Sequence, residues 1–232
     1  MTTVNVPGSF GTDIYGVNAV GQTVGQFNTN TVLLGQTAHG VLRDADGTLT
    51  AFDVPGANGT VAHGINDTGE IAGFYVTATG HLHSFLRDSG GSFTLFDVPG
   101  SLETVSLGIN DAGQIVGYYN SLQTGSHGFL RDSGGGFQTF DLPMCGVALP
   151  LGINDSGQIT GFSTCGDSFV ATASDFLPPS QPGPGSSSPE PSTLLQLSTC
   201  LSLFLLKKTA VGLKSAFQSR RSVHLQAGPG AC

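Results

Sequence analysis

The 232-residue sequence contains no Trp, only eight Lys and Arg residues and only four Cys. Charged residues make up 10% of the chain and hydrophobic residues 38%, a balance too apolar for an extended, highly charged disordered protein. The Cys residues show neither a Cys-x-x-Cys pair nor a Cys/His zinc spacing, and they are too few for a disulfide scaffold. The composition therefore predicts a folded chain without a cofactor.

The few basic residues are unevenly placed. Residues 1–176 hold three Arg, no Lys and fifteen acidic residues, a formal charge of −12, whereas residues 177–232 hold five basic residues and one acidic residue. Nucleic-acid binding needs clustered cations, so the acidic part excludes nucleic acid as its partner. The basic end, which adjoins an apolar run, suggests instead a segment directed to a membrane.

Glycine is abundant, with 35 residues, which favours turn-rich all-β structure because glycine is costly inside a helix. The glycines belong to a repeat. The motif Gly-Ile-Asn-Asp-x-Gly begins at Gly64, Gly108 and Gly152, with a weaker copy at Gly16. Two further motifs keep the same 44-residue phase: His-x-x-Leu-Arg-Asp begins at His39, His83 and His127, and Phe-Asp-Val/Leu-Pro ends at Pro55, Pro99 and Pro143.

Each period is predicted to form four short strands. In the second period they are expected near residues 60–66, 70–77, 83–88 and 92–98, separated by Asn-Asp-x-Gly, Thr/Gly, Ser-Gly-Gly and Pro-Gly turns. In the last strand Phe93 and Leu95 point to one face, and Phe96 and Val98 to the other. A sheet that is apolar on both faces must lie between other sheets, which here can only be further repeats.

A four-stranded antiparallel unit of this length that packs on its own copies is typical of a β-propeller blade. The predicted fold is therefore all-β, a β-propeller-like array of about four blades in residues 1–176. The blade boundaries are expected near residues 9–55, 56–99, 100–143 and 144–176. The fourth period lacks its outer strand, and residues 2–7 align with that strand, so they are predicted to complete the last blade. The alternatives are an open stack or a piece of a longer propeller.

The recurring Asn-Asp pairs have a structural and a functional interpretation. Calcium ligation would need alternating carboxylates and a terminal Glu, which the motif lacks, so a turn is favoured. Three histidines at one repeat position are weak candidates for a metal site, because packing would conserve the same pattern: His39, His83 and His127. The Arg-Asp pairs at residues 43–44, 87–88 and 131–132 are interpreted as an ion pair or turn contact in each blade, with Asp53, Asp97 and Asp141 as further partners.

No arrangement of residues points to catalysis. The sequence contains no Gly-x-Ser-x-Gly, Walker or His-Glu-x-x-His motif. The segment Gly166-Asp167-Ser168 resembles part of a hydrolase motif, but decay of the fourth repeat explains it better. Cys145 and Cys165 would form a disulfide if the protein were exported. No catalytic residue is predicted, and the ligand-binding residues are left open.

The C-terminal part consists of three segments. Residues 177–188 form a Pro/Gly/Ser linker, residues 189–208 contain an apolar run that ends at Lys207-Lys208, and residues 209–232 form a basic tail that is expected to be disordered. The apolar run would make a short hydrophobic helix of about 20 Å, whereas a bilayer core is about 30 Å thick. Residues 1–42 contain no Lys or Arg and no sustained apolar stretch, so no signal peptide is recognised.

Two family resemblances follow from these motifs. Pro189-Glu190-Pro191, with the apolar run and the basic pair, resembles the PEP-CTERM sorting signal of Gram-negative bacteria, although 24 residues follow Lys208. The repeats in residues 4–170 resemble the HAF family of extracellular repeat proteins. The resemblance implies an exosortase-type membrane enzyme as a partner, and a cell-surface or extracellular location in species that make exopolysaccharide or biofilm matrix.

The predicted function is that of a non-catalytic extracellular or surface-associated repeat protein, with exopolysaccharide or another matrix component as its ligand. Two alternatives are left open. One is a propeller enzyme that acts on polysaccharide, which would need residues that break the repeat at the ring centre. The other is a purely structural repeat module, because a fold does not fix a function.

Overall fold

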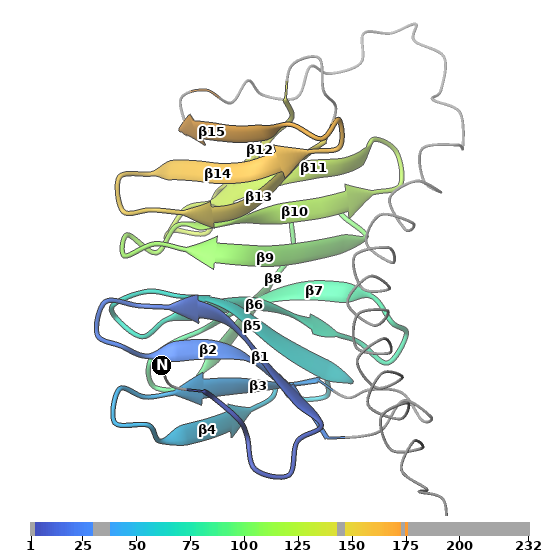
Figure 1. The fold of residues 1–232 in the computed structure, drawn as a ribbon. Helices are drawn as coiled ribbons and strands as arrows, with labels where there is room; N and C mark the ends of the chain where they lie inside the picture. Colours follow the sequence, from blue (N-terminus) through green and yellow to red (C-terminus); the bar gives the residue numbers. More distant parts are fainter. Residues whose placement is uncertain (1–2, 30–37, 143–146, 173–174, 176–232) are drawn as a thin grey trace, which may run out of the picture. The chain divides into compact units, whose positions relative to one another are not determined.

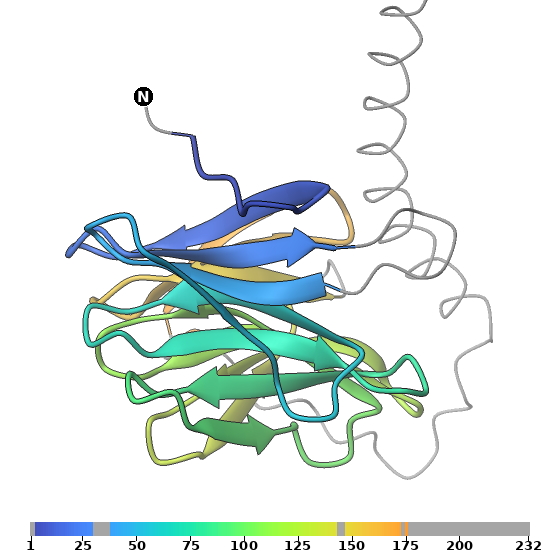
Figure 2. The ribbon, with the colours of Figure 1, turned by 90° about the horizontal axis from the view of Figure 1, so that it is seen from below.

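The structure, a computed structural model, describes residues 3–29, 38–142, 147–172 and 175. Within these ranges the chain forms strands grouped into four antiparallel sheets (Figure 1). Consecutive sheets contact one another face to face, as the blades of a four-bladed β-propeller (Figures 1 and 2). The all-β propeller fold predicted from the 44-residue period is confirmed.

Each blade is a meander of neighbouring strands that starts with its innermost strand. Blade 1 contains β1 (Gly11–Val17), β2 (Thr23–Asn28), β3 (Ala38–Arg43) and β4 (Leu49–Phe52). Blade 2 contains β5 (Gly59–Ile65), β6 (Ile71–Val76), β7 (Leu82–Arg87) and β8 (Phe93–Phe96). Blade 3 contains β9 (Glu103–Ile109), β10 (Ile115–Ser121), β11 (Gly125–Arg131) and β12 (Phe137–Phe140). Blade 4 contains β13 (Ala148–Ile153), β14 (Gln158–Ser163) and β15 (Ser168–Thr172).

The strands of the second repeat end within two residues of their predicted bounds. The turn residues set these ends: Gly69 adopts a φ of +82° between β5 and β6, a conformation that other residues rarely adopt. Its N–H closes the turn by donating to the carbonyl of Asn66 (3.1 Å). The same bond recurs at Gly21, Gly113 and Gly157. Local sequence therefore decides where each strand stops.

The hydrophobic core consists of three similar clusters, one between each pair of consecutive blades. The cluster between blades 2 and 3, for example, contains Ala72, Val98, Ile109, Ile115, Tyr119 and Phe129. The outer strand β8 contributes to two clusters, because Phe93 packs on the core next to blade 1 and Phe96 on the core next to blade 3. The predicted double-sided sheet is thus confirmed at these two positions. Leu95, in contrast, is 49% exposed.

The innermost strands approach one another at a row of equivalent glycines, Gly16, Gly64, Gly108 and Gly152. A Cβ atom on Gly64 would lie 3.0 Å from the backbone N of Ile109, and one on Gly108 would lie 2.9 Å from the Cα of Gly152. The distance at Gly108 is shorter than those that real Cβ atoms adopt, and the distance at Gly64 is tighter than nearly all of them, so a side chain at either position would push on the next strand. A Cβ on Gly152 would meet only Thr160 Oγ1, at 3.8 Å.

The predicted N-terminal outer strand of blade 4 is not formed. Residues 3–7 lie in no strand, and among the described residues β15 pairs with β14 alone. Residues 3–7 instead form a connection into blade 1 that resembles the connections leading into blades 2 and 3. The N–H of Val6 donates to Thr12 Oγ1 (3.1 Å), and the N–H groups of Val54 and Val98 donate in the same way to Thr60 and Thr104. These bonds tie the Val-Pro-Gly segment to the blade that follows it, which is why the motif does not by itself create a strand on the preceding blade.

The predicted C-terminal segments, residues 177–188, 189–208 and 209–232, lie outside the described residues, as does Cys145. Within the described part of the chain, no helix has the length and apolar character that crossing a membrane requires.

The glycine row makes a paired prediction about stability. Gly108→Ala should lower the free energy of unfolding by about 1–3 kcal/mol, because its Cβ would collide with blade 4. Gly152→Ala, the equivalent change without such a neighbour, should change the free energy of unfolding by less than about 0.5 kcal/mol. Urea unfolding of the two variants beside the parent protein measures both values. If both variants lost the same free energy of unfolding, the contact between inner strands would not be the reason why these positions require glycine.

Candidate functional site

The Asn-Asp-x-Gly motif builds a closed turn at one end of each blade. In blade 2 the Oδ1 atom of Asn66 accepts hydrogen bonds from the N–H of Glu70 (2.9 Å) and the hydroxyl of Thr68 (2.8 Å). Asn110 and Asn154 accept the corresponding backbone bonds from Gln114 and Gln158. The side chain of the Asn thus replaces a missing backbone partner, as expected for this residue in turns.

The same motif also joins consecutive blades. Asn66 Nδ2 donates to the carbonyl of Asn110 (3.2 Å), and the N–H of Asp67 donates to Asp111 Oδ1 (2.7 Å). Equivalent pairs of bonds run from blade 1 to blade 2 and from blade 3 to blade 4. We call this series the turn ladder. It supports the structural interpretation of the Asn-Asp pairs, because the Asn side chains and one carboxylate oxygen of each Asp bond within or between blades.

An open groove of about 390 Å³ lies beside the turn ladder, between blades 2 and 3. It is lined by residues from the turns and strand ends of both blades: Thr68, Glu70, Leu86, Asp88, Ser89, Asp111, Ala112, Gly113, Arg131 and Ser133. The hydroxyl groups, carboxylates and one guanidinium can donate and accept hydrogen bonds at short range. The groove is therefore chemically suited to a polyhydroxylated ligand.

Glu70 distinguishes this groove from its equivalents, since Gln22, Gln114 and Gln158 occupy the same position in the other blades. In blade 1 the Gln22 Nε2 donates to Asp44 Oδ1 (2.7 Å). An ionised Glu70 cannot make the corresponding bond to Asp88, and its Oε2 accepts one from Asn66 Nδ2 (2.7 Å). The groove between blades 2 and 3 consequently carries an extra negative charge.

Two of the three repeated Arg residues, Arg87 and Arg131, pack between blades rather than pair with carboxylates. The guanidinium of Arg131 lies 4.6 Å from the centre of the Phe96 ring in blade 2, and that of Arg87 lies 4.8 Å from the Phe52 ring in blade 1. Their Nη1 atoms donate to backbone carbonyls of the next residue, Asp132 and Asp88. The interpretation as a turn contact is correct, and the predicted partnership with Asp53, Asp97 and Asp141 is wrong.

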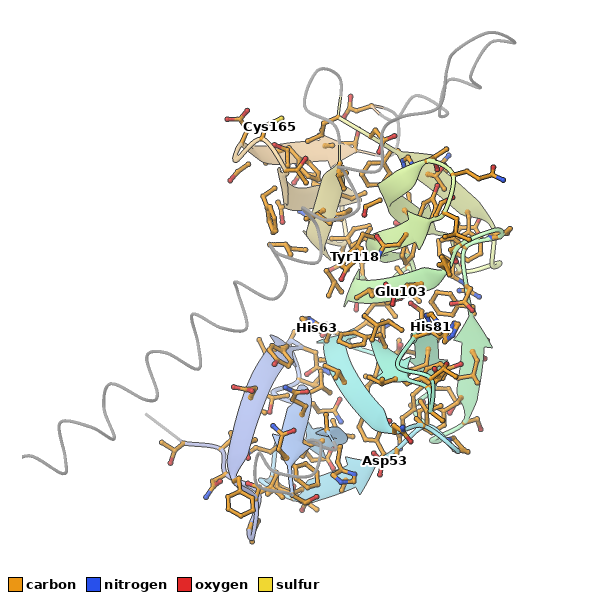
Figure 3. All side chains as sticks on the ribbon, turned by 90° about the vertical axis from the view of Figure 1, so that its right-hand side faces the viewer. Asp53, His63, His81, Glu103, Tyr118 and Cys165 are labelled. Carbon is orange, nitrogen blue, oxygen red and sulfur yellow. The ribbon has the colours of Figure 1, made fainter. Side chains whose placement is uncertain are left out.

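Those three aspartates bind the repeated histidines instead. His39 Nδ1 lies 2.9 Å from Asp53, and the pairs His83–Asp97 and His127–Asp141 are each 2.8 Å apart. Each histidine ring also packs on an aromatic ring of its own blade, Phe27, Tyr75 or Tyr119. Each His–Asp pair therefore links two strands of its own blade. The described residues contain no group of three His, Cys, Asp or Glu side chains that could hold a metal ion. Figure 3 labels Asp53 on blade 1.

Aromatic rings from two blades stack on the inner strands. The Tyr15 and His63 rings are parallel within 10°, with centroids 4.4 Å apart, and Phe74 lies beyond His63 at 6.0 Å. Burial lowers the pKa of His63 to about 4, so this imidazole is neutral at physiological pH. Burial and the Asp13 charge raise the pKa of Tyr15 to about 12, which keeps its phenol protonated.

A second polar cluster contains Glu103 at the start of β9 (Figure 3). Its carboxylate accepts a hydrogen bond from Asn120 Nδ2 (2.9 Å) and lies 3.9 Å from His81 Nδ1 in blade 2. Burial, with the Glu103 charge as a second cause, raises the pKa of Tyr118 to about 12. Neither Glu103 nor His63 was singled out from the sequence. Both break the repeat, since Gly59 is the equivalent of Glu103 and Leu107 the equivalent of His63.

Blade 4 contains the remaining candidates. Cys165 and Asp167 lie in the turn that joins β14 to β15 (Figure 3 labels Cys165). The partner proposed for Cys165, Cys145, lies outside the described residues, so the disulfide stays a prediction. The described structure places Asp167 in a short connection of the decayed repeat.

Comparisons with known proteins show no family. No family model matches the chain, and no curated protein matches it. A streptogramin B lyase structure is 16% identical, with a TM-score of 0.41, over 73% of this chain and 56% of its own length. A catalytically inactive virginiamycin B lyase from Staphylococcus aureus, with quinupristin, is 13% identical with a TM-score of 0.32, over 78% of this chain and 74% of that one. The chain thus spans about half the length of the first of these structures.

His63 makes the stability depend on pH. Its pKa is about 4 in the folded protein and 6.5 in the unfolded chain, so the unfolded chain binds the extra proton first as the pH falls. Stability should therefore be lost between pH 6.5 and pH 4, by up to about 3 kcal/mol from this residue. His63→Leu, which places the residue of blades 3 and 4 in blade 2, should remove this part of the loss. Urea unfolding of both proteins from neutral pH to pH 4 measures the difference.

Leu151→Met, at the equivalent position of blade 4, supplies the control. It leaves the number of titratable groups unchanged, so its pH dependence should match that of the parent protein. If His63→Leu kept the full pH dependence, burial of the neutral imidazole would not be its source.

Proposed function

We propose that the protein is a non-catalytic, surface-associated repeat protein that binds exopolysaccharide or a related matrix glycan in the grooves between its blades. The observation that supports this proposal is the groove between blades 2 and 3, with its hydrogen-bonding side chains, together with the repetition of the turns that frame it. The turn ladder recurs between blades 1 and 2 and between blades 3 and 4. The sequence repeat thus places similar turns side by side.

A repeated surface suits a repetitive polymer. Weak contacts at the groove and at neighbouring turns of the ladder add up when one polymer chain spans several of them, because each later contact forms at a high effective concentration. Sugar hydroxyls both donate and accept hydrogen bonds, and the groove offers partners of both kinds in Ser133, Asp88 and Arg131. These features favour a polysaccharide over a small apolar ligand.

The charge of the surface narrows the class of glycan. Residues 1–176 carry a formal charge of −12, and Glu70 adds a carboxylate where the other blades have Gln. Polyanionic glycans would meet repulsion here, whereas neutral or amino-bearing glycans would not. We therefore propose neutral or amino-bearing polysaccharides as the preferred ligands.

The proposed location rests on sequence resemblance. The segment 189–208, with Pro189, Glu190 and Pro191, resembles a sorting signal that an exosortase-type enzyme would process, and the repeats resemble HAF extracellular repeats. A glycan-binding array at the surface of a Gram-negative bacterium would hold the matrix polymer close to the cell.

A groove-filling substitution tests the proposal. Ser133→Tyr places a ring in the groove from an exposed position and removes none of the hydrogen bonds described above. It should weaken binding to a neutral or amino-bearing polysaccharide by at least about tenfold, because the ring excludes the polymer from the groove. Co-sedimentation or calorimetry with a neutral glucan, a partly deacetylated amino-sugar polymer and an anionic uronate polymer measures the affinity and its charge preference.

Thr94→Tyr is the matched control, since Thr94 is exposed on β8 and does not line the groove. It should bind as the parent protein does. Absence of binding to all three polymers would overturn the proposal and leave the structural repeat module as the remaining interpretation.

A further inference from the structure

Blade 1 and blade 4 each have one face that no other blade covers in the described structure. The equivalent faces of the other blades are buried in the contacts between consecutive blades. Val17 on β1 is 69% exposed, whereas its equivalents Ile65 and Ile109 are 6% and 7% exposed in the clusters between blades. Val170 on β15 is 70% exposed, whereas its equivalent Leu130 is 5% exposed. Each exposed valine is thus a core residue that lacks its neighbouring blade.

Blade 4 also has a hollow at the place where the inner strand of a following blade would pack. A hollow of about 260 Å³ is lined by Gly152, Ile153, Asn154, Gln158 and Thr160. In blade 3 the equivalents of Gly152 and Asn154 are Gly108 and Asn110, which contact Gly152 and bond to the carbonyl of Asn154. The hollow therefore occupies the place that the following blade fills elsewhere in the molecule.

The hydrogen-bonding groups at the two ends are complementary as well. Within the described residues Asn154 Nδ2 donates only to Gln158 of its own blade, while Asn110 Nδ2 donates to the next blade too. On blade 1 the carbonyl of Asn18 is the equivalent of the carbonyls that accept this bond, those of Asn66, Asn110 and Asn154. One end therefore supplies the donor and the other the acceptor.

We propose that blade 4 of one chain docks on blade 1 of a second copy of this chain, head to tail, through the same contacts that join consecutive blades. The occupant follows from continuity with the three interfaces inside the chain: within the described residues, the free face of blade 1 offers the matching glycine, apolar residue and Asn carbonyl together. The contact is heterologous, because each partner uses a different face. It does not depend on the proposed glycan binding.

One residue makes this contact weaker than the internal ones. At the position of Asp67, Asp111 and Asp155, blade 1 carries Ala19, so the N–H of Asp155 in the first copy would meet no carboxylate in the second. The turn ladder would continue across the contact with its Asn bond but without its Asp bond. The association should therefore be reversible and concentration-dependent.

Complementation between two variants tests the head-to-tail geometry. Val17→Glu damages the blade 1 face and Val170→Glu the blade 4 face, and both positions are exposed in the single chain, so neither change should alter its unfolding. Sedimentation of the full chain should show assembly for the parent protein, and at least a tenfold weaker association for each variant alone. An equimolar mixture should form dimers, because one intact face remains on each variant.

Two further variants distinguish the proposed contact from non-specific association. Gly152→Ala should weaken assembly without changing unfolding, because its Cβ would point at Gly16 of the second copy. Ala19→Asp should strengthen assembly by about tenfold, because it supplies the missing acceptor for the Asp155 N–H. A parent protein that stays monomeric at every accessible concentration would overturn the proposal. A lower free energy of unfolding in Val17→Glu and Val170→Glu would also overturn it, because blades 1 and 4 of one chain would then cover each other. The absence of a dimer in the equimolar mixture would overturn it as well.

Discussion

The close approach of consecutive inner strands is the constraint on which the rest of the structure depends. Gly16, Gly64 and Gly108 each leave no room for a Cβ, since the next strand or its own neighbour fills that space. This backbone contact sets the distance between blades, and both the core clusters and the turn ladder are built at that distance. Large aromatic residues such as Phe85 and Phe129 then fill the space farther from the inner strands.

The repeated residues stabilise the blades, whereas the residues that depart from the repeat give single blades their own charge and polar groups. The Asn-Asp motif, the His–Asp pairs and the Arg–Phe contacts all maintain a blade or join two blades. The residues that depart from the repeat are different in character: Glu70 adds charge to a groove, His63 brings a neutral imidazole into a ring stack, and Glu103 collects polar partners from two blades. Ligand recognition in a repeat protein is most readily changed at such positions, because they do not alter the blade framework.

Residue types and their phase were sufficient to predict the blades, since a glycine with positive φ ends a strand wherever it stands and a sheet apolar on both faces requires neighbours. The same local reasoning failed where a choice between distant partners was needed. Asp53, Asp97 and Asp141 were assigned to the arginines, yet they bind the histidines, because the β3–β4 register places His39 near Asp53. Residues 3–7 resemble an outer strand in sequence, but their Val-Pro-Gly turn is bonded to the blade that follows.

The sequence by itself determined the fold class, the order of the strands within a repeat and the role of the Asn-Asp-x-Gly motif as a turn, because these follow from residue types and turn signals close together in the chain. Only the tertiary structure decided which repeated side chains meet across blades, which polar groups line a groove, and which faces are left uncovered at the two ends. Those outcomes depend on the stacking distance and register of whole sheets. Neither is encoded within a single period, and both emerge only when one blade is packed against the next.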